Sequence, residues 1–232
     1  MSASRLPLPN MRGATTPAMR RVLLGGGLSL LLAAWLGPLP ALAQHSFAAH
    51  MAMHMTVVAV AAPLLAIGLA GSAADPVLRV PWLFSPMLAA VLEFMVVWTW
   101  HAPLLHHAAR DGLVMRALEQ GSFLAVGLWL WLAACGGGAH RPRERTAAGI
   151  GGLLLTSMHM TLLGVLLAGA TRPLYAHGGE THHAMPIVMG ALQDQQLGGV
   201  LMLAVGGSAY LGGALLLLAG LLRERGQEVR NA

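Results

Sequence analysis

Long apolar runs, separated by short segments that hold most of the arginines, constrain this chain more than any other feature of its sequence. The runs lie at about residues 22–43, 49–71, 83–102, 118–136, 148–170 and 195–222. Each is close to the length of about 20 residues that an α-helix needs to cross a bilayer. Only 10% of the residues are charged, against about 25% in soluble domains. The sequence therefore predicts an all-α, polytopic membrane helix bundle.

The first apolar run has two interpretations. Arg20 and Arg21 precede it, and Ala41-x-Ala43 ends it. A charged start, an apolar middle and small residues at the end are typical of a secretory signal, which would be cleaved here before Gln44. Uncleaved, the same run is a first membrane helix. The expected division is a polar segment 1–21, a signal or first helix 22–43, a membrane domain 44–222 and a tail 223–232, with six membrane helices or five after cleavage.

The arginines sort by the predicted topology. If the amino end lies inside, the inside segments are 1–21, 72–82, 137–147 and 223–232, and they hold eleven of the fourteen arginines. The outside segments hold Arg110, Arg116 and Arg172. Cytoplasmic loops carry an excess of Lys and Arg. This bias predicts a multi-pass protein of the plasma (inner) membrane with a cytoplasmic carboxyl terminus.

The same topology gathers the histidines on one side. Nine of the eleven fall on or near the outer face: His45, His50, His54, His101, His106, His107, His177, His182 and His183. His140 lies inside, and His159 lies about midway along its run. The outer, periplasmic face is therefore where the chemistry is expected.

The run at 49–71 begins with His50-Met51-Ala52-Met53-His54-Met55. His50 and His54 are four residues apart, so they stack on one helix face with Met53 on its flank. Imidazole and thioether are ligand types that suit Cu(I), and ionisable side chains within a membrane segment indicate a function. Alternatively, the histidines bond to headgroups or neighbouring helices while the methionines fill the packing.

Two further histidines are candidates to complete such a site. His101 ends the run at 83–102, at the same depth as His50 and His54. His159 lies deeper, between two methionines, and is either a ligand or an interhelical hydrogen-bonding residue. The order of the runs places both on helices other than the one that carries His50.

The outer loops hold weaker candidates. His177, His182 and His183 form a His-rich loop, which either captures metal or is an ordinary solvated loop. His106 and His107 are expected in the loop that follows the run at 83–102.

Three single residues remain. Glu93 and Asp194 have two interpretations each, and Cys135 has no expected function. Glu93, in the middle of its run, is either part of a proton or ion route or an interhelical hydrogen-bonding group. Asp194 precedes the last run and is either the N-cap of that helix or part of the outer site. Cys135 lies at the cytoplasmic end of its helix, opposite the histidines. As the single cysteine, it excludes an intrachain disulfide and a cysteine-paired metal site.

Other classes of function are disfavoured. The chain shows no nucleophile triad, no paired catalytic carboxylates and no dinucleotide motif, so we do not expect an enzyme. Its arginines lie at the ends of apolar runs, where membrane orientation explains them, so we expect no nucleic-acid partner.

Six motifs, in this order, resemble the CtaG family of multi-pass cytochrome c oxidase assembly factors. They are His50-Met51-x-x-His54 with Ala61-Ala-Pro63-Leu-Leu65-x-x-Gly68; Trp100-His101-x-Pro103-Leu104; Gly127-Leu-Trp129-Leu-Trp131; Met158-His159-x-x-x-x-Gly164; Arg172-Pro173-Leu174-Tyr175; and Asp194-Gln195-Gln196-Leu197-x-Gly199. Together they cover about residues 48–207. The chain does not resemble the unrelated single-span copper chaperone that shares the family's name.

The resemblance implies a helical membrane protein that helps to assemble a haem-copper oxidase at its copper-insertion step. It implies, as partners, a cytochrome c oxidase subunit or a copper chaperone, besides membrane lipid. The positions that it marks as family-type polar residues are His50, His54, His101, His159, Tyr175 and Asp194.

The leading hypothesis is a copper-handling assembly factor without catalytic turnover. Cu(I) is expected at the outer face on His50, Met53 and His54, with His101 or His159 completing the coordination. The His-rich loop would collect the ion.

Three alternatives stay open. An inward copper transporter would use Met158, His159 and Glu93 along its path. A membrane cytochrome b would use His54 and His159 as axial haem ligands. A structural chaperone would dock an oxidase subunit while its histidines serve packing.

Overall fold

The structure, a computed structural model, describes residues 15–138, 142–175 and 189–231. Its helices are α1 (Pro17–Leu36), α2 (Leu39–Ala43), α3 (Phe47–Met55), α4 (Ala62–Leu69), α5 (Pro76–Arg79), α6 (Pro86–Trp100), α7 (Pro103–Asp111), α8 (Leu113–Cys135), α9 (Arg143–Ala168), α10 (Ala191–Leu201) and α11 (Ser208–Asn231). Two π-helical segments join consecutive helices: η1 (Thr56–Ala61) follows α3, and η3 (Met202–Gly207) follows α10. No strand occurs in the described ranges, so the predicted all-α class is confirmed.

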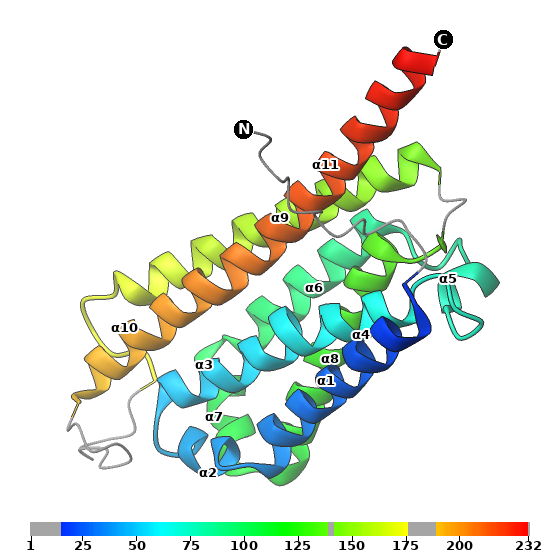
Figure 1. Ribbon diagram of the computed structural model, residues 1–232. Helices are drawn as coiled ribbons and strands as arrows, with labels where there is room; N and C mark the ends of the chain where they lie inside the picture. Colours follow the sequence, from blue (N-terminus) through cyan, green and yellow to red (C-terminus); the bar gives the residue numbers. More distant parts are fainter. Residues whose placement is uncertain (1–14, 139–141, 176–188, 232) are drawn as a thin grey trace, which may run out of the picture.

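The helices form a bundle whose two ends differ (Figure 1). α2, α3, α7 and α10 gather at one end, whereas α5 lies at the other. We call the first the histidine end, because His50, His54, His101 and His106 lie there. Along the bundle, α11 packs against α9, and α1 packs against η1 and α4.

The long helices match the predicted apolar runs. Five stretches are long and apolar enough to cross a membrane: Pro17–Leu36, Phe47–Leu69, Leu113–Cys135, Arg143–Ala168 and Ala191–Asn231. A sixth passes this test only if α6 and α7 are taken together, and these two are bent by 74°. The protein is thus a multi-pass membrane bundle in which the α6–α7 pair bends sharply at the histidine end.

The break follows from Pro103. The residue before a proline avoids the helical region, and Ala102 is extended, with φ −64° and ψ 129°. Proline fits the first turn of a helix, so the chain starts α7 at once and packs it against α8. The prediction that His106 and His107 lie in a loop is therefore wrong, because both belong to α7.

α1 is closely packed against α4. A Cβ atom added to Gly27 of α1 would lie 2.8 Å from Cγ of Leu65, and one added to Gly68 would lie 2.9 Å from Cγ of Leu24. Small residues allow membrane helices to approach in this way. In the structure, α1 is therefore a member of the bundle.

The contact between α9 and α10 depends on another glycine. A Cβ atom at Gly199 would lie 2.5 Å from the backbone nitrogen of Ala168 and 2.8 Å from the carbonyl oxygen of Gly164. Since backbone atoms cannot move aside, we expect Gly199→Ala to destabilise the protein by about 2 kcal/mol. Thermal unfolding in detergent measures the loss. Gly212→Ala is the control, because a Cβ there meets nothing within 4 Å, and equal melting temperatures would contradict this prediction.

Candidate metal centre

Four polar side chains are buried together at the histidine end. His50 and His54 come from α3, His106 from α7 and Glu119 from α8. Their exposed fractions are 2%, 1%, 1% and 0% respectively. We call these four residues the histidine cluster.

Glu119 is the centre of the cluster. Its Oε1 lies 3.1 Å from His50 Nε2 and 3.5 Å from His54 Nε2. The two imidazoles meet edge to face, with 4.3 Å between ring centroids, as their spacing on one helix predicted. A buried carboxylate is costly unless a cation balances it. That charge would come either from a proton shared with an imidazole or from a bound metal ion.

Gln120 fixes the hydrogen-bonding state of His54. Trp35 Nε1, which can only donate, donates to Gln120 Oε1 at 3.1 Å. The amide nitrogen of Gln120 therefore points the other way, toward His54 Nδ1 at 3.0 Å and Glu119 Oε2 at 3.3 Å. His54 Nδ1 must accept this hydrogen bond, so the imidazole proton lies on Nε2, facing Glu119. Both nitrogen atoms of His54 are thus engaged.

His50, His106 and Glu119 form the candidate ligand set. Each offers one ligand atom, and these atoms lie within 4.8 Å of one another. The rings of His50 and His106 are 4.6 Å apart between centroids. His106 Nε2 is buried and has no hydrogen-bond partner among the described residues. A buried imidazole nitrogen without a partner, beside a carboxylate, fits a bound cation.

His101 and Tyr175 lie beside the cluster. The His101 ring is 6.3 Å from that of His54, and its Nδ1 donates to the carbonyl oxygen of Val97 at 2.6 Å. Tyr175 donates to the backbone carbonyl of His101 at 2.7 Å, and its ring lies 4.5 Å from that of His106. Burial raises the pKa of Tyr175 to about 12. The phenol is therefore a neutral donor that holds the turn at His101 against the cluster.

Asp194 caps the helix that carries two of the histidines. Its carboxylate accepts from Ser46 Oγ at 2.7 Å and from the backbone N–H groups of Phe47 at 2.5 Å and Ala48 at 3.2 Å. These N–H groups have no partner within α3. The predicted N-cap role at its own helix is wrong, because Gly190 occupies that position in α10. Asp194 instead stabilises the start of α3 across the bundle.

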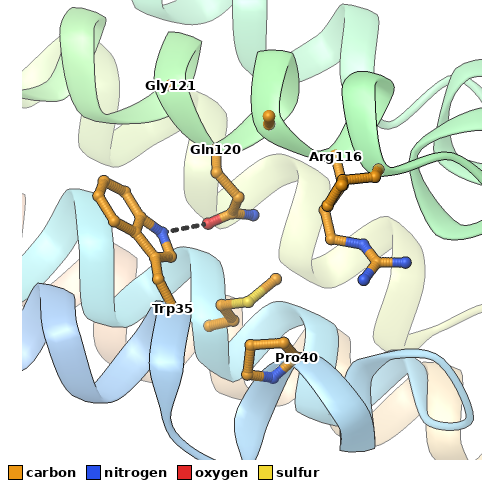
Figure 2. A pocket seen from close by; sticks show the side chains of 8 residues that line it. Trp35, Pro40, Arg116, Gln120 and Gly121 are labelled. Carbon is orange, nitrogen blue, oxygen red and sulfur yellow. Dashed lines mark hydrogen bonds between the residues drawn. The ribbon is translucent and has the colours of Figure 1, made fainter.

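Met53 lines a pocket next to the cluster. The pocket has a volume of about 400 Å³ and is lined by Trp35, Pro40, Met53, Leu113, Arg116, Ala117, Gln120 and Gly121. Figure 2 shows the indole of Trp35 and the amide of Gln120 joined by their hydrogen bond at its wall. Because Gln120 also contacts His54 and Glu119, the pocket ends directly beside the candidate ligands.

Among the remaining predicted ligands that the structure describes, His159 is not part of the cluster. His159 lies on α9, 5% exposed, and its ring contacts Phe94 with 5.3 Å between centroids. Neither of its ring nitrogens has a hydrogen-bond partner within the part of the chain that the structure describes. His177, His182 and His183 lie outside the described residues.

Comparison with known families decides the assignment. The family model described as cytochrome c oxidase caa3 assembly factor (Caa3_CtaG) matches residues 6–224. The chain belongs to this family. The match runs from before α1 into α11 and includes the whole histidine cluster, which confirms the resemblance seen in the six motifs. Comparisons with curated proteins and with solved structures give no match.

Glu119 and Gln120 were not among the predicted site residues. Both residues fall within the predicted apolar run at 118–136, and α8, which begins at Leu113, places Glu119 inside a membrane-length helix. A carboxylate there requires a partner. The facing histidines are the groups that meet this requirement, and this signal was present in the sequence.

Proposed function

We propose that this caa3 assembly factor binds a copper ion in the histidine cluster, on the periplasmic side of the plasma (inner) membrane, and transfers it to a cytochrome c oxidase subunit. The observation that carries the proposal is the approach of the donor atoms of His50, His106 and Glu119 to within 4.8 Å. Imidazole suits copper, and the carboxylate balances the charge of the ion. Copper is cargo here, so no catalytic turnover is needed.

The structure supports different roles for the two other predicted ligands on α3. His54 is held by Glu119 and Gln120 through both nitrogens, so its role in the proposal is to orient the carboxylate. The same engagement disfavours His54 as an axial ligand to haem. Met53 lines the pocket, so a Cu(I) ion that arrives there meets a thioether before it reaches the imidazoles.

Such a site is suited to release as well as capture. Three ligands of two chemical types form no closed thiolate cage of the kind that holds a structural metal. A soft donor at Met53 offers an exchange position beside them. Soft ligands of a partner that reach the pocket would then replace the ligands of the ion by stepwise exchange.

The test is the copper content of the oxidase. A caa3-type oxidase is co-expressed with the wild-type factor or with variants, in a host that lacks its own factor, and copper is measured per haem in the purified enzyme. We expect His50→Ala/His106→Ala to yield copper-deficient oxidase, because two of the three proposed ligands are lost.

His45→Ala is the matched control, because His45 is an exposed histidine just before α3. It should give oxidase with full copper. The membrane level and the melting temperature of each variant are measured in parallel. Copper-replete oxidase made with folded His50→Ala/His106→Ala would refute copper transfer. It would leave a docking role in assembly.

A further inference from the structure

A second buried carboxylate lies away from the histidine cluster. Glu93 of α6 is 0% exposed, eight residues before His101, which corresponds to about 12 Å along the helix. Thr156 of α9 donates to its Oε2 at 2.9 Å, and the hydroxyl of Tyr210 of α11 donates to its Oε1. Glu93 therefore joins three helices in the interior of the bundle.

No cation among the described residues is paired with this carboxyl. The ion pairs of the described residues leave Glu93 without an Arg or His partner. Among titratable side chains on the packed helices, Tyr210 bonds to it directly, and His159 packs on the neighbouring Phe94. An ionised carboxylate without a cation is costly in a membrane interior, whereas the protonated form is neutral.

A protonated carboxyl needs an acceptor for its O–H, and the backbone supplies one through Tyr210. The Tyr210 hydroxyl lies 3.4 Å from the carbonyl oxygen of Val58 in η1. The N–H of Ala62, which would bond to Val58 in an α-helix, bonds to the carbonyl of Val57 instead. Pro63, the next residue, has no N–H. The π-helical segment thus frees the Val58 carbonyl for Tyr210.

The site accommodates both protonation states. When Glu93 is ionised, Tyr210 and Thr156 donate to its two oxygens. When it is protonated, its O–H donates to Tyr210, which turns its own hydrogen to Val58. Only one hydroxyl hydrogen has to rotate between the two patterns, and no backbone group has to move.

Unpartnered imidazole nitrogens lie on α9, which carries Thr156, and at the end of α6, which carries Glu93. Thr156 and His159 are three residues apart on α9, so they share one helix face, as Glu93, Val97 and His101 share one on α6. His101 Nε2 and both ring nitrogens of His159 are buried without hydrogen-bond partners in the described ranges. Buried polar groups of this kind are normally satisfied by ordered water.

We infer that Glu93, Tyr210 and Thr156 form a membrane-buried proton-binding site that exchanges with the histidine end through His159 and His101. The ligand is a proton, and the site is separate from copper handling. No bond other than O–H and N–H bonds is formed or broken. A proton bound from the water at the histidine end passes by way of the imidazoles to the carboxylate, and it returns by the same route.

Infrared difference spectroscopy of the purified full-length protein at neutral pH tests this inference. We expect a C=O stretching band of a protonated carboxyl, which Glu93→Gln removes and which Tyr210→Phe shifts by the loss of one hydrogen bond. Thr156→Val gives a second shift if Tyr210→Phe does not fold. In D2O the band of the wild type should move as O–H becomes O–D, and His159→Leu should slow that exchange.

Each contrary outcome is decisive. Absence of the band from the wild type would show that Glu93 is ionised. Persistence of the band in Glu93→Gln, with its loss in Glu119→Gln, would assign the proton to the histidine cluster instead. A band that belongs to Glu93 but never responds to D2O would reduce the site to a fixed interhelical hydrogen bond.

Discussion

Glu119→Gln is expected to weaken copper binding to the purified protein by about 100-fold. The substitution keeps the shape of the side chain but removes the negative charge that faces His50 and His54 at 3.1 Å and 3.5 Å. A cation bound beside these imidazoles would then lack a balancing charge in a buried site. Anaerobic Cu(I) titration against a competing chelator measures the affinity.

Glu144→Gln is the control, since this glutamate is exposed near the start of α9, and it should bind copper as the wild type does. The same titration distinguishes the proposed ligands His50, His106 and Glu119 from the set predicted on one helix, His50, Met53 and His54. Met53→Leu should slow loading more than it lowers affinity, since Met53 lines the pocket. Unchanged affinity in a folded Glu119→Gln protein would remove Glu119 from the ligand set.

The bundle could be predicted from the sequence because apolar length is a strong constraint. A run of about 20 apolar residues has few alternatives to a membrane helix, and five of the runs overlap helices that are long and apolar enough to cross a membrane. The exception is the run at 83–102. α6 ends at Trp100, and Pro103 restarts the chain as α7 at an angle of 74°. A proline shows that a helix breaks, but the direction of the next helix depends on tertiary packing.

Only the part of the candidate site whose residues lie close together in sequence could be predicted. The pairing of His50 with His54 follows from helical spacing, and the two rings do meet. The presence of His106 depends on α7 folding back over α8, and the meeting of Glu119 with α3 joins residues 69 positions apart in sequence. No periodicity in one segment encodes such contacts.

Asp194 shows how distant segments build the site together. The sequence allows Asp194 either a capping role at the last span or a place at the outer site. In the structure it caps a helix, but that helix is α3, which carries His50 and His54. It lies in the first turn of α10 and bonds to the start of α3. The first turn of α3 leads directly to His50, so Asp194 ties the start of the helix that carries this imidazole to α10.

Asp194→Ala is accordingly expected to destabilise the protein by about 3 kcal/mol, or to lower its melting temperature by about 10 °C. The substitution leaves Ser46 Oγ and the N–H groups of Phe47 and Ala48 without their acceptor. Each buried donor without a partner costs about 1–3 kcal/mol. Asp194→Asn keeps one acceptor oxygen and should lose about half as much. Thermal unfolding in detergent, followed by circular dichroism, measures both.

Asp111→Ala controls for the loss of an acidic residue at the same end of the bundle, because Asp111 is exposed at the end of α7. It should change the melting temperature little. Copper titration of Asp194→Ala, below its melting transition, then separates capping from coordination. A cap predicts a lower melting temperature with a folded protein that still binds copper. A ligand predicts the reverse, because a metal-free protein would lose little stability and the copper affinity would fall steeply.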